Sequence, residues 1–233
     1  MAKAGHMRRG VPRWLSGRFR GLTLVLLVLS VSSVAISQDD LRKVFDGVAF
    51  TALLLLAIRI VGPRLRIVTV ALVVPTLLAH WIQHLSDSSI HRIIGLGLAT
   101  VFLTFLTLVI MVAVFRDESV SADTIVGAVC AYLLIGVTWG SAYALLVVVS
   151  PDSLSVSPAL AQASGWGKSI SAFTPVLQYY SFTTLATLGY GDVSPLSSGA
   201  RALSVMEGLT GQLYLAVLVA RLVGVYTAQA LKP

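Results

Sequence analysis

Residues 179–192 read Tyr-Tyr-Ser-Phe-Thr-Thr-Leu-Ala-Thr-Leu-Gly-Tyr-Gly-Asp, and the architecture follows from this stretch. A helix is predicted from Pro175 to Ala186, because proline is tolerated in a first helical turn. Such a helix is about 18 Å long and too short to cross a hydrocarbon core of about 30 Å. Gly189 and Gly191 then allow backbone conformations that other residues avoid. A chain that enters a membrane and turns back must bury its returning backbone in protein or line an aqueous path with it.

The chain as a whole is apolar enough to require lipid. Of its 233 residues, 56% are hydrophobic and 12% are charged, whereas soluble domains average about 45–50% and about 25%. Runs long enough to span a bilayer occur at 21–37, 44–61, 67–85, 93–115, 125–149 and 203–225. The sequence therefore predicts an all-α membrane protein with six transmembrane helices. The re-entrant segment lies between the fifth and the sixth.

The basic residues predict the orientation. With both termini in the cytoplasm, the opposite side receives only Arg42, Lys43, Arg92, Lys168 and Arg201, and the other twelve of the 17 Lys and Arg are cytoplasmic, as the positive-inside rule expects. The segment 1–20 is then a basic cytoplasmic N-terminus, and 21–115 is a charge-poor bundle of four spans. The net charge of +7 belongs to these flanks, so nucleic-acid binding is not expected.

The first span can also be interpreted as a signal peptide, with small residues around Ala35-Ile36-Ser37. Its apolar stretch exceeds the usual length of about 7–15 residues, which favours a retained anchor. Either interpretation leaves the later spans in the same orientation.

Residues Thr187 to Asp192 resemble the filter of the tetrameric potassium channel family, which reads Thr-x-Gly-Tyr-Gly-Asp. In that family four loops meet on one axis, and their carbonyl oxygens replace the hydration shell of K⁺. The resemblance implies that the carbonyls of Thr187, Leu188, Gly189 and Tyr190 bind permeant K⁺, with the Thr187 hydroxyl completing the innermost site. It also implies a homotetramer in the lipid bilayer of a bacterial inner membrane, without a cofactor.

The same resemblance assigns supporting roles around the filter. Gly191 would help Gly189 to direct successive carbonyls at the axis. Tyr190 would point away from it and wedge against Tyr179 and Tyr180, while Asp192 would lie at the outer mouth, hydrogen-bonded to Tyr180. Leu188 stands where the family usually has Val or Ile. Only its carbonyl would face the ion, so this departure is expected to change filter rigidity rather than selectivity.

The sixth span extends the resemblance, which gives a pore module at 125–227. Pro195, Arg201 and Gly211 sit at the family's offsets, and Gly211 would act as a gating hinge. Glu207 is an acid inside a membrane span, where ionisable residues are functional candidates. We expect it to bond Thr184 or another pore-helix hydroxyl and so brace the filter; a direct role as an ion or proton sensor is the alternative.

The fourth span, 93–115, contains no charged residue. A span without charge gains no energy from the membrane potential, so weak voltage dependence is expected. With no cytoplasmic domain evident, regulation would need a separate protein. No catalytic triad or nucleotide loop appears, and an enzyme is not expected.

Two further functions stay open at this point. A membrane subunit of a potassium-uptake transporter system usually carries four degenerate filter repeats in one chain, and here there is one intact motif. A non-conducting membrane sensor could keep a channel-like fold.

Overall fold

The structure is a computed structural model that describes residues 18–35, 39–85, 88–116, 121–167 and 173–230. The predicted basic segment before residue 18 and most of the possible cleavage site lie outside these ranges. The elements in chain order are α1 (Arg18–Ala35), α2 (Asp39–Ile60), α3 (Arg66–Leu85), α4 (Ser89–Arg116), α5 (Ala122–Val149), a 3₁₀ turn (Pro151–Ser153), β1 (Leu154–Val156), α6 (Pro158–Ser164), α7 (Phe173–Leu185), β2 (Val193–Pro195) and α8 (Ser198–Ala230).

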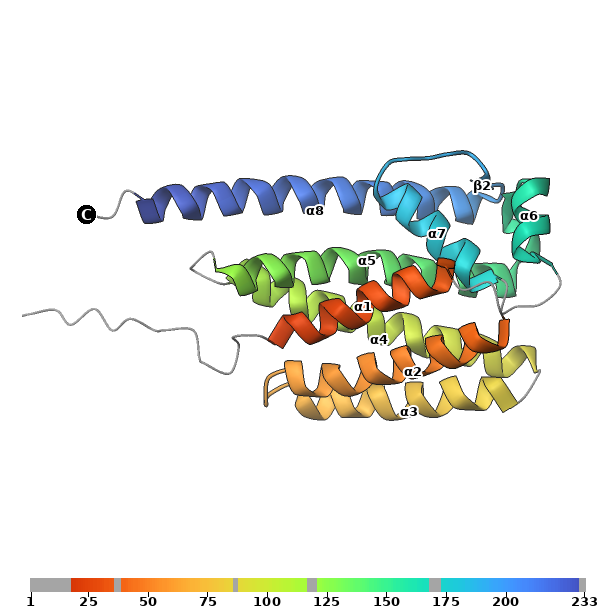
Figure 1. Cartoon of the computed structure of the whole chain (residues 1–233), viewed down its shortest axis with the longest axis horizontal. Helices are drawn as coiled ribbons and strands as arrows, with labels where there is room; N and C mark the ends of the chain where they lie inside the picture. The colour runs from red at the N-terminus through yellow and green to blue at the C-terminus, as the bar shows by residue number, and fades with distance from the viewer. Residues whose placement is uncertain (1–17, 36–38, 86–87, 117–120, 168–172, 231–233) are drawn as a thin grey trace, which may run out of the picture.

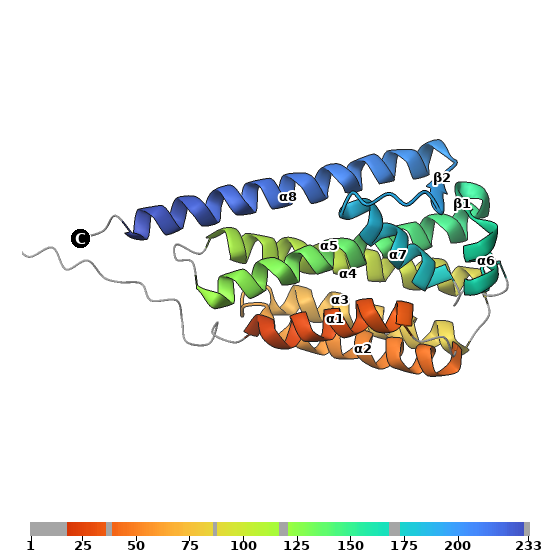
Figure 2. The same ribbon diagram turned by 45° about the horizontal axis from the view of Figure 1, so that its top comes forward.

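The fold is an all-α membrane protein in which the long helices alternate in direction. α1 begins, and α8 ends, at the same end of the molecule (Figures 1 and 2). α8 runs alongside α5 on one flank, while α2 and α3 form the opposite flank. The small antiparallel pair β1–β2 at the far end joins Leu154 to Pro195 and Val156 to Val193. The sequence analysis did not predict these strands.

One apolar core runs through α1, α2, α4 and α5. Its fully buried side chains come from all four helices: Leu22, Leu26, Leu53, Leu54, Phe102, Leu106, Ile110 and Leu134. α1 is therefore an integral part of the bundle and packs against α5 as well as α2. Burial of a Leu or Phe side chain stabilises by about 1.5–3 kcal/mol when the alternative is water, and close packing takes over this role where the alternative is lipid.

Three of the described helices are long and apolar enough to cross a membrane: Ser89–Arg116, Ala122–Val149 and Ser198–Ala228. Shorter apolar helices cover Phe19–Ser30 and Arg66–Ile82. All three long helices extend beyond the spans predicted from sequence, because polar residues continue each helix past its apolar run. The count of six spans stays a prediction.

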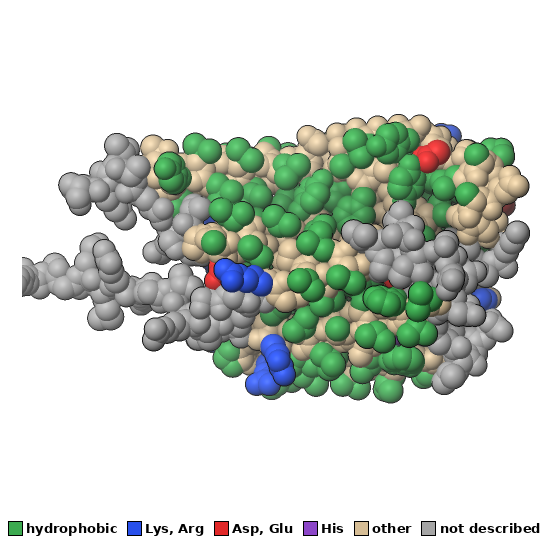
Figure 3. Space-filling model, viewed as in Figure 1, with side chains coloured by type: hydrophobic (Ala, Val, Ile, Leu, Met, Phe, Trp, Pro, Cys, Tyr) green, Lys and Arg blue, Asp and Glu red, His purple; other side chains and the backbone are tan. Residues whose placement is uncertain are grey.

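Hydrophobic side chains cover much of the side of the molecule, and the few charged ones lie toward its ends (Figure 3). The exposed apolar residues include Ile67, Leu24, Val74 and Leu78. Patches of this extent are rare on soluble monomers, and they suit a lipid environment.

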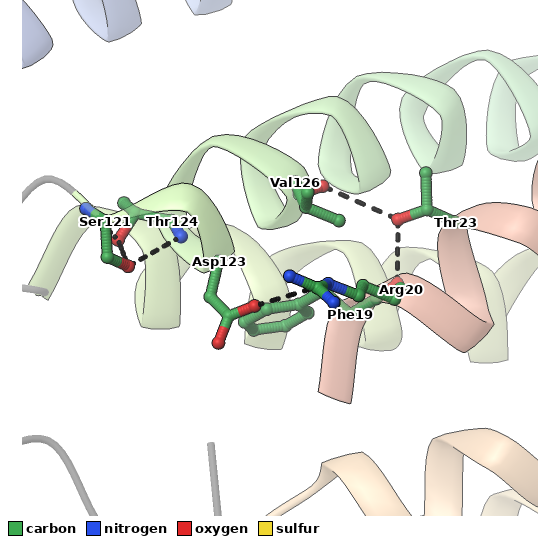
Figure 4. A network of polar contacts seen from close by, with 7 residues as sticks. All are labelled: Phe19, Arg20, Thr23, Ser121, Asp123, Thr124 and Val126. Carbon is green, nitrogen blue, oxygen red and sulfur yellow. Dashed lines mark hydrogen bonds and ion pairs between the residues drawn. The ribbon is translucent and has the colours of Figure 1, made fainter. Parts of the chain in front are cut away.

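Polar contacts attach the start of α1 to the start of α5 (Figure 4). Ser121 caps α5 in a reciprocal capping box with Thr124, which satisfies backbone donors that the first turn leaves open. The Thr23 hydroxyl lies 3.5 Å from the Val126 carbonyl, and Arg20 lies 4.0 Å from Asp123. These contacts hold the first turns of α1 against the first turns of α5.

Candidate functional site: a re-entrant helix and loop

The candidate site is α7 and the loop that follows it. α7 has 13 residues and is about 20 Å long, which is too short to cross a bilayer. It descends from the β1–β2 end toward the middle of the molecule, and the loop returns to that end (Figures 1 and 2). The helix occupies Phe173–Leu185 rather than the predicted Pro175–Ala186. Pro175 still lies in its first turn, where its missing N–H is no loss.

The loop backbone alternates between ordinary and left-handed conformations. The φ angles are +58° at Thr187, +54° at Gly189 and +80° at Gly191. Glycine adopts positive φ readily, but a β-branched residue there is an outlier. Thr187 is the one non-glycine residue with positive φ among those described. Strain of this kind clusters at functional sites, where the surrounding structure maintains it.

The amide groups of the loop are turned toward α7. The N–H groups of Leu188 and Gly189 donate to the Thr183 carbonyl over 2.8 and 3.3 Å, and the Thr187 N–H donates to Thr184 over 3.0 Å. Across the described ranges, no hydrogen bond ends on the carbonyl oxygens of residues 187–190. Backbone carbonyls left open in this way are the groups that ion filters use to bind cations.

The two adjacent tyrosines of α7 have different neighbours. The Tyr190 ring stacks on Tyr179, with centroids 6.4 Å apart and planes within 3°. Tyr180 turns instead to Tyr143 of α5, at 4.9 Å between ring centroids. The expectation that Tyr190 wedges against both is therefore corrected, because successive helical residues point about 100° apart and only one can face the loop.

Asp192 closes the loop at the end next to β2. Its carboxylate accepts a hydrogen bond of 2.7 Å from the Tyr179 hydroxyl, so the predicted partner Tyr180 is wrong. The Tyr180 hydroxyl lies 2.6 Å from Ser204 instead. Tyr179 thus holds the loop at two points, since its ring stacks on Tyr190 and its hydroxyl binds Asp192.

Glu207 of α8 is fully buried and joins three helices. Its carboxyl oxygens lie 2.5 Å from the Ser181 hydroxyl of α7 and 2.7 Å from the Tyr143 hydroxyl of α5. The α7 hydroxyl that meets Glu207 is thus Ser181 rather than Thr184. Ser181 also donates to the Gly136 carbonyl over 2.7 Å. Glu207 is placed where it can hold α7 and α8 at a fixed separation.

Gly136 and Gly140 of α5 form the groove that receives α7. A Cβ at Gly140 would lie 2.7 Å from Gln178, and one at Gly136 would overlap the Phe182 ring. These partners are four residues apart, as the glycines are, and share one face of α7. The sequence analysis missed this pair, although two glycines at i and i+4 in an apolar span are a signal of close helix packing.

The Gly136→Val variant should lower the thermal stability of the purified protein, because overpacking a filled site costs about 1–3 kcal/mol. The measurement is the melting temperature in detergent, followed by size-exclusion chromatography. Gly97→Val is the matched control, since Gly97 lies in α4 and a Cβ added there would have no neighbouring atom within 4 Å. Equal melting temperatures for the two variants would contradict the groove.

Gly211 lets α8 approach the end of α7. A Cβ there would lie 2.6 Å from the Leu185 carbonyl oxygen and 2.8 Å from a Leu185 methyl carbon. Close packing of α8 against Leu185 therefore explains why residue 211 is a glycine. The hinge role of Gly211 stays a prediction. Arg201 lies in the first turns of α8 and is exposed, and Pro195 ends β2.

Comparison with known protein families identifies a match over the segment that contains α7 and its loop. Residues 155–228 match a family model described as an ion channel. The matched segment runs from β1 through α7 and the loop into α8, and the match supports an ion channel domain in this part of the membrane protein. The match does not include α5. No curated protein and no solved structure matches the chain.

Proposed function

We propose that the chain is one subunit of a potassium-selective channel, in which residues 187–190 of four copies surround a common axis. One observation carries the proposal: the loop turns its amide groups back to α7 and leaves its carbonyl oxygens without a partner in the described structure. Inside a membrane such carbonyls need a ligand or water. A ring of them can replace the hydration shell of K⁺.

The alternating backbone supports this role. In a regular strand successive residues alternate between two faces, and the carbonyls would do the same. The positive φ values at Thr187, Gly189 and Gly191 interrupt that alternation and allow consecutive carbonyls to share one side. The Thr187 hydroxyl lies 2.7 Å from the Ala186 carbonyl, at the inner end of the loop, where the resemblance places the innermost ion site.

The exposed surface of α8 supports assembly. Only 17% of its most apolar stretch is buried, compared with 44% for α5. Val205, Met206, Leu209 and Leu213 are each more than half exposed. Each chain supplies one loop, and four copies would complete the ring and cover part of this face, with lipid covering the remainder. We place both termini in the cytoplasm, because the basic residues favour that orientation.

The test is ion flux through the purified protein in lipid vesicles loaded with K⁺. We expect K⁺ efflux that far exceeds Na⁺ efflux under matched gradients, in vesicles that contain the tetramer. Equal K⁺ and Na⁺ flux would contradict selectivity, and absence of flux would favour a non-conducting sensor.

Channel opening should depend weakly on voltage. α4 has charged residues only near its two ends, Arg92 and Arg116, and each charge that crosses 100 mV is worth about 2.3 kcal/mol. Conductance should therefore change gradually from −100 to +100 mV in planar bilayer recordings, on the order of the response to one gating charge or fewer per subunit. A steep sigmoidal conductance–voltage curve would contradict this prediction.

A further inference from the structure

Beyond Gly211, α8 contacts its own subunit along one narrow stripe. The less exposed residues between Gln212 and Ala228 recur at helical spacing: Tyr214, Leu218, Arg221, Leu222 and Val225. Residues spaced by three, four and seven lie on one helix face. The position of this half of α8 relative to the bundle depends on few contacts, and one of them is charged.

Arg221 holds the end of α4. Its guanidinium donates a hydrogen bond of 2.7 Å to the Val114 carbonyl, in the last turn of α4, where carbonyls have no partner within the helix. The cation also meets the negative end of the helix dipole there. Its central carbon lies 5.7 Å from the centre of the Phe115 ring, within the range of a cation–π contact.

The end of α4 that Arg221 contacts is itself firmly packed. Val114 is buried, and a Cβ on Gly127 of α5 would lie 3.0 Å from it. The Phe115 ring meets the edge of Tyr214 at 6.1 Å, and the Tyr214 hydroxyl donates to the Ala128 carbonyl over 2.7 Å. α4 and α5 thus present a fixed docking point to α8.

We propose that Arg221 acts as a clasp, a side-chain contact that couples the α1–α4 bundle to the half of α8 beyond Gly211. The proposal rests on the proposed channel function and adds a positioning residue to it. α4 ends at Arg116 and α5 begins at Ala122, so the intervening segment is short. That segment joins the end of α4 to α5, and the Arg221–Val114 hydrogen bond adds a direct contact from the end of α4 to α8. Removal of the Arg221 side chain changes the ratio of open to closed channels and leaves the filter intact.

The first test measures the open probability of single channels. Arg221→Leu should change the open-to-closed ratio by about tenfold or more, as expected for loss of one charged hydrogen bond. The K⁺ to Na⁺ ratio should stay at the wild-type value. Arg221→Lys should lie between Leu and wild type, because Lys keeps the charge and loses the planar fork.

Two controls separate the clasp from a general loss of charge. Arg116→Leu removes a cation from the last turn of α4, which also contains Val114, and it keeps the hydrogen bond from Arg221 to Val114. This variant should leave the open-to-closed ratio unchanged. Phe115→Leu should shift that ratio in the same direction as Arg221→Leu, and the double variant should show less than the combined effect. An Arg116 effect equal to that of Arg221, or full additivity of the two variants, would overturn the proposal.

A second measurement does not depend on conduction. Hydrogen–deuterium exchange of wild-type and variant protein in lipid nanodiscs reports how firmly α8 is held beyond Gly211. Arg221→Leu should speed exchange of residues 214–228 by at least about threefold over wild type and Arg116→Leu, because local opening is easier when contacts are removed. Unchanged exchange would overturn the clasp even if the channel conducts. If wild-type protein carries no K⁺, the channel proposal fails while exchange still decides the clasp.

Discussion

Replacing Gly189 by Ala should lower K⁺ flux at least about tenfold and reduce the preference for K⁺ over Na⁺. Gly189 has a φ of +54°, and a residue with a Cβ loses about 1–2 kcal/mol in this conformation. Four copies surround one axis in our proposal, so the penalty is incurred four times. The backbone should relax to negative φ and turn carbonyls away from the ion.

The measurement is K⁺ and Na⁺ efflux from vesicles that hold equal amounts of assembled protein. Gly199→Ala is the matched control. Gly199 is the second residue of α8, its φ is not in the left-handed region, and its nearest neighbour atom would be 4.0 Å from a Cβ. Ala favours helix over Gly by about 1 kcal/mol, so this control should keep wild-type flux. Wild-type selectivity in Gly189→Ala would show that the left-handed backbone at residue 189 is not needed.

The second large effect is expected at Glu207. The Glu207→Leu variant removes the 2.7 Å acceptor of the buried Tyr143 hydroxyl and the bond from Ser181 to α8, and a buried polar group without its partner costs about 1–3 kcal/mol. α7 should then lose its fixed position against α8. We expect assembled protein to fall several-fold and K⁺ flux per assembled channel to fall with it.

Glu207→Gln distinguishes a brace from a charged sensor. Ser181 has one hydroxyl proton and lies close to two acceptors, Glu207 and the Gly136 carbonyl. A Gln amide can donate to Ser181 and accept from Tyr143, which satisfies every group. Flux and assembly of Glu207→Gln should therefore stay within about twofold of wild type, since the hydrogen bonds are retained. Loss of flux in Glu207→Gln with normal assembly would favour the sensor role.

The positions of the helices were predictable because the signals are local. Apolar runs and the proline near the start of α7 located the long helices and the re-entrant helix to within a few residues. Polar residues at the helix ends carried no such signal, and α8 consequently begins five residues before its predicted span at 203–225 and ends five residues after it. The connection between the fifth and sixth predicted spans, residues 150–202, also contains the short strand pair β1–β2. The sequence did not predict this pair, since three-residue strands have no recognisable period.

The partners of the site residues could not be predicted from the sequence. Tyr179 and Tyr180 are neighbours on a helix, and which one faces Asp192 depends on how α7 is rotated against α5. That rotation is set by Gly136 and Gly140, far earlier in the chain. Ser181 was one of several pore-helix hydroxyls open to Glu207, and only the packed structure selects it. Positive φ at Thr187 has no sequence signal, because β-branched residues rarely adopt it.

The most direct measurement is the position of bound ions in the assembled protein. Crystals of the tetramer should be grown in Rb⁺, a heavier substitute for K⁺. We expect their anomalous-difference map to show a row of peaks on the four-fold axis. The peaks should lie between the carbonyl oxygens of residues 187–190 from all four subunits. Loops that face lipid or a neighbouring helix, with no peak on a shared axis, would contradict the proposed function.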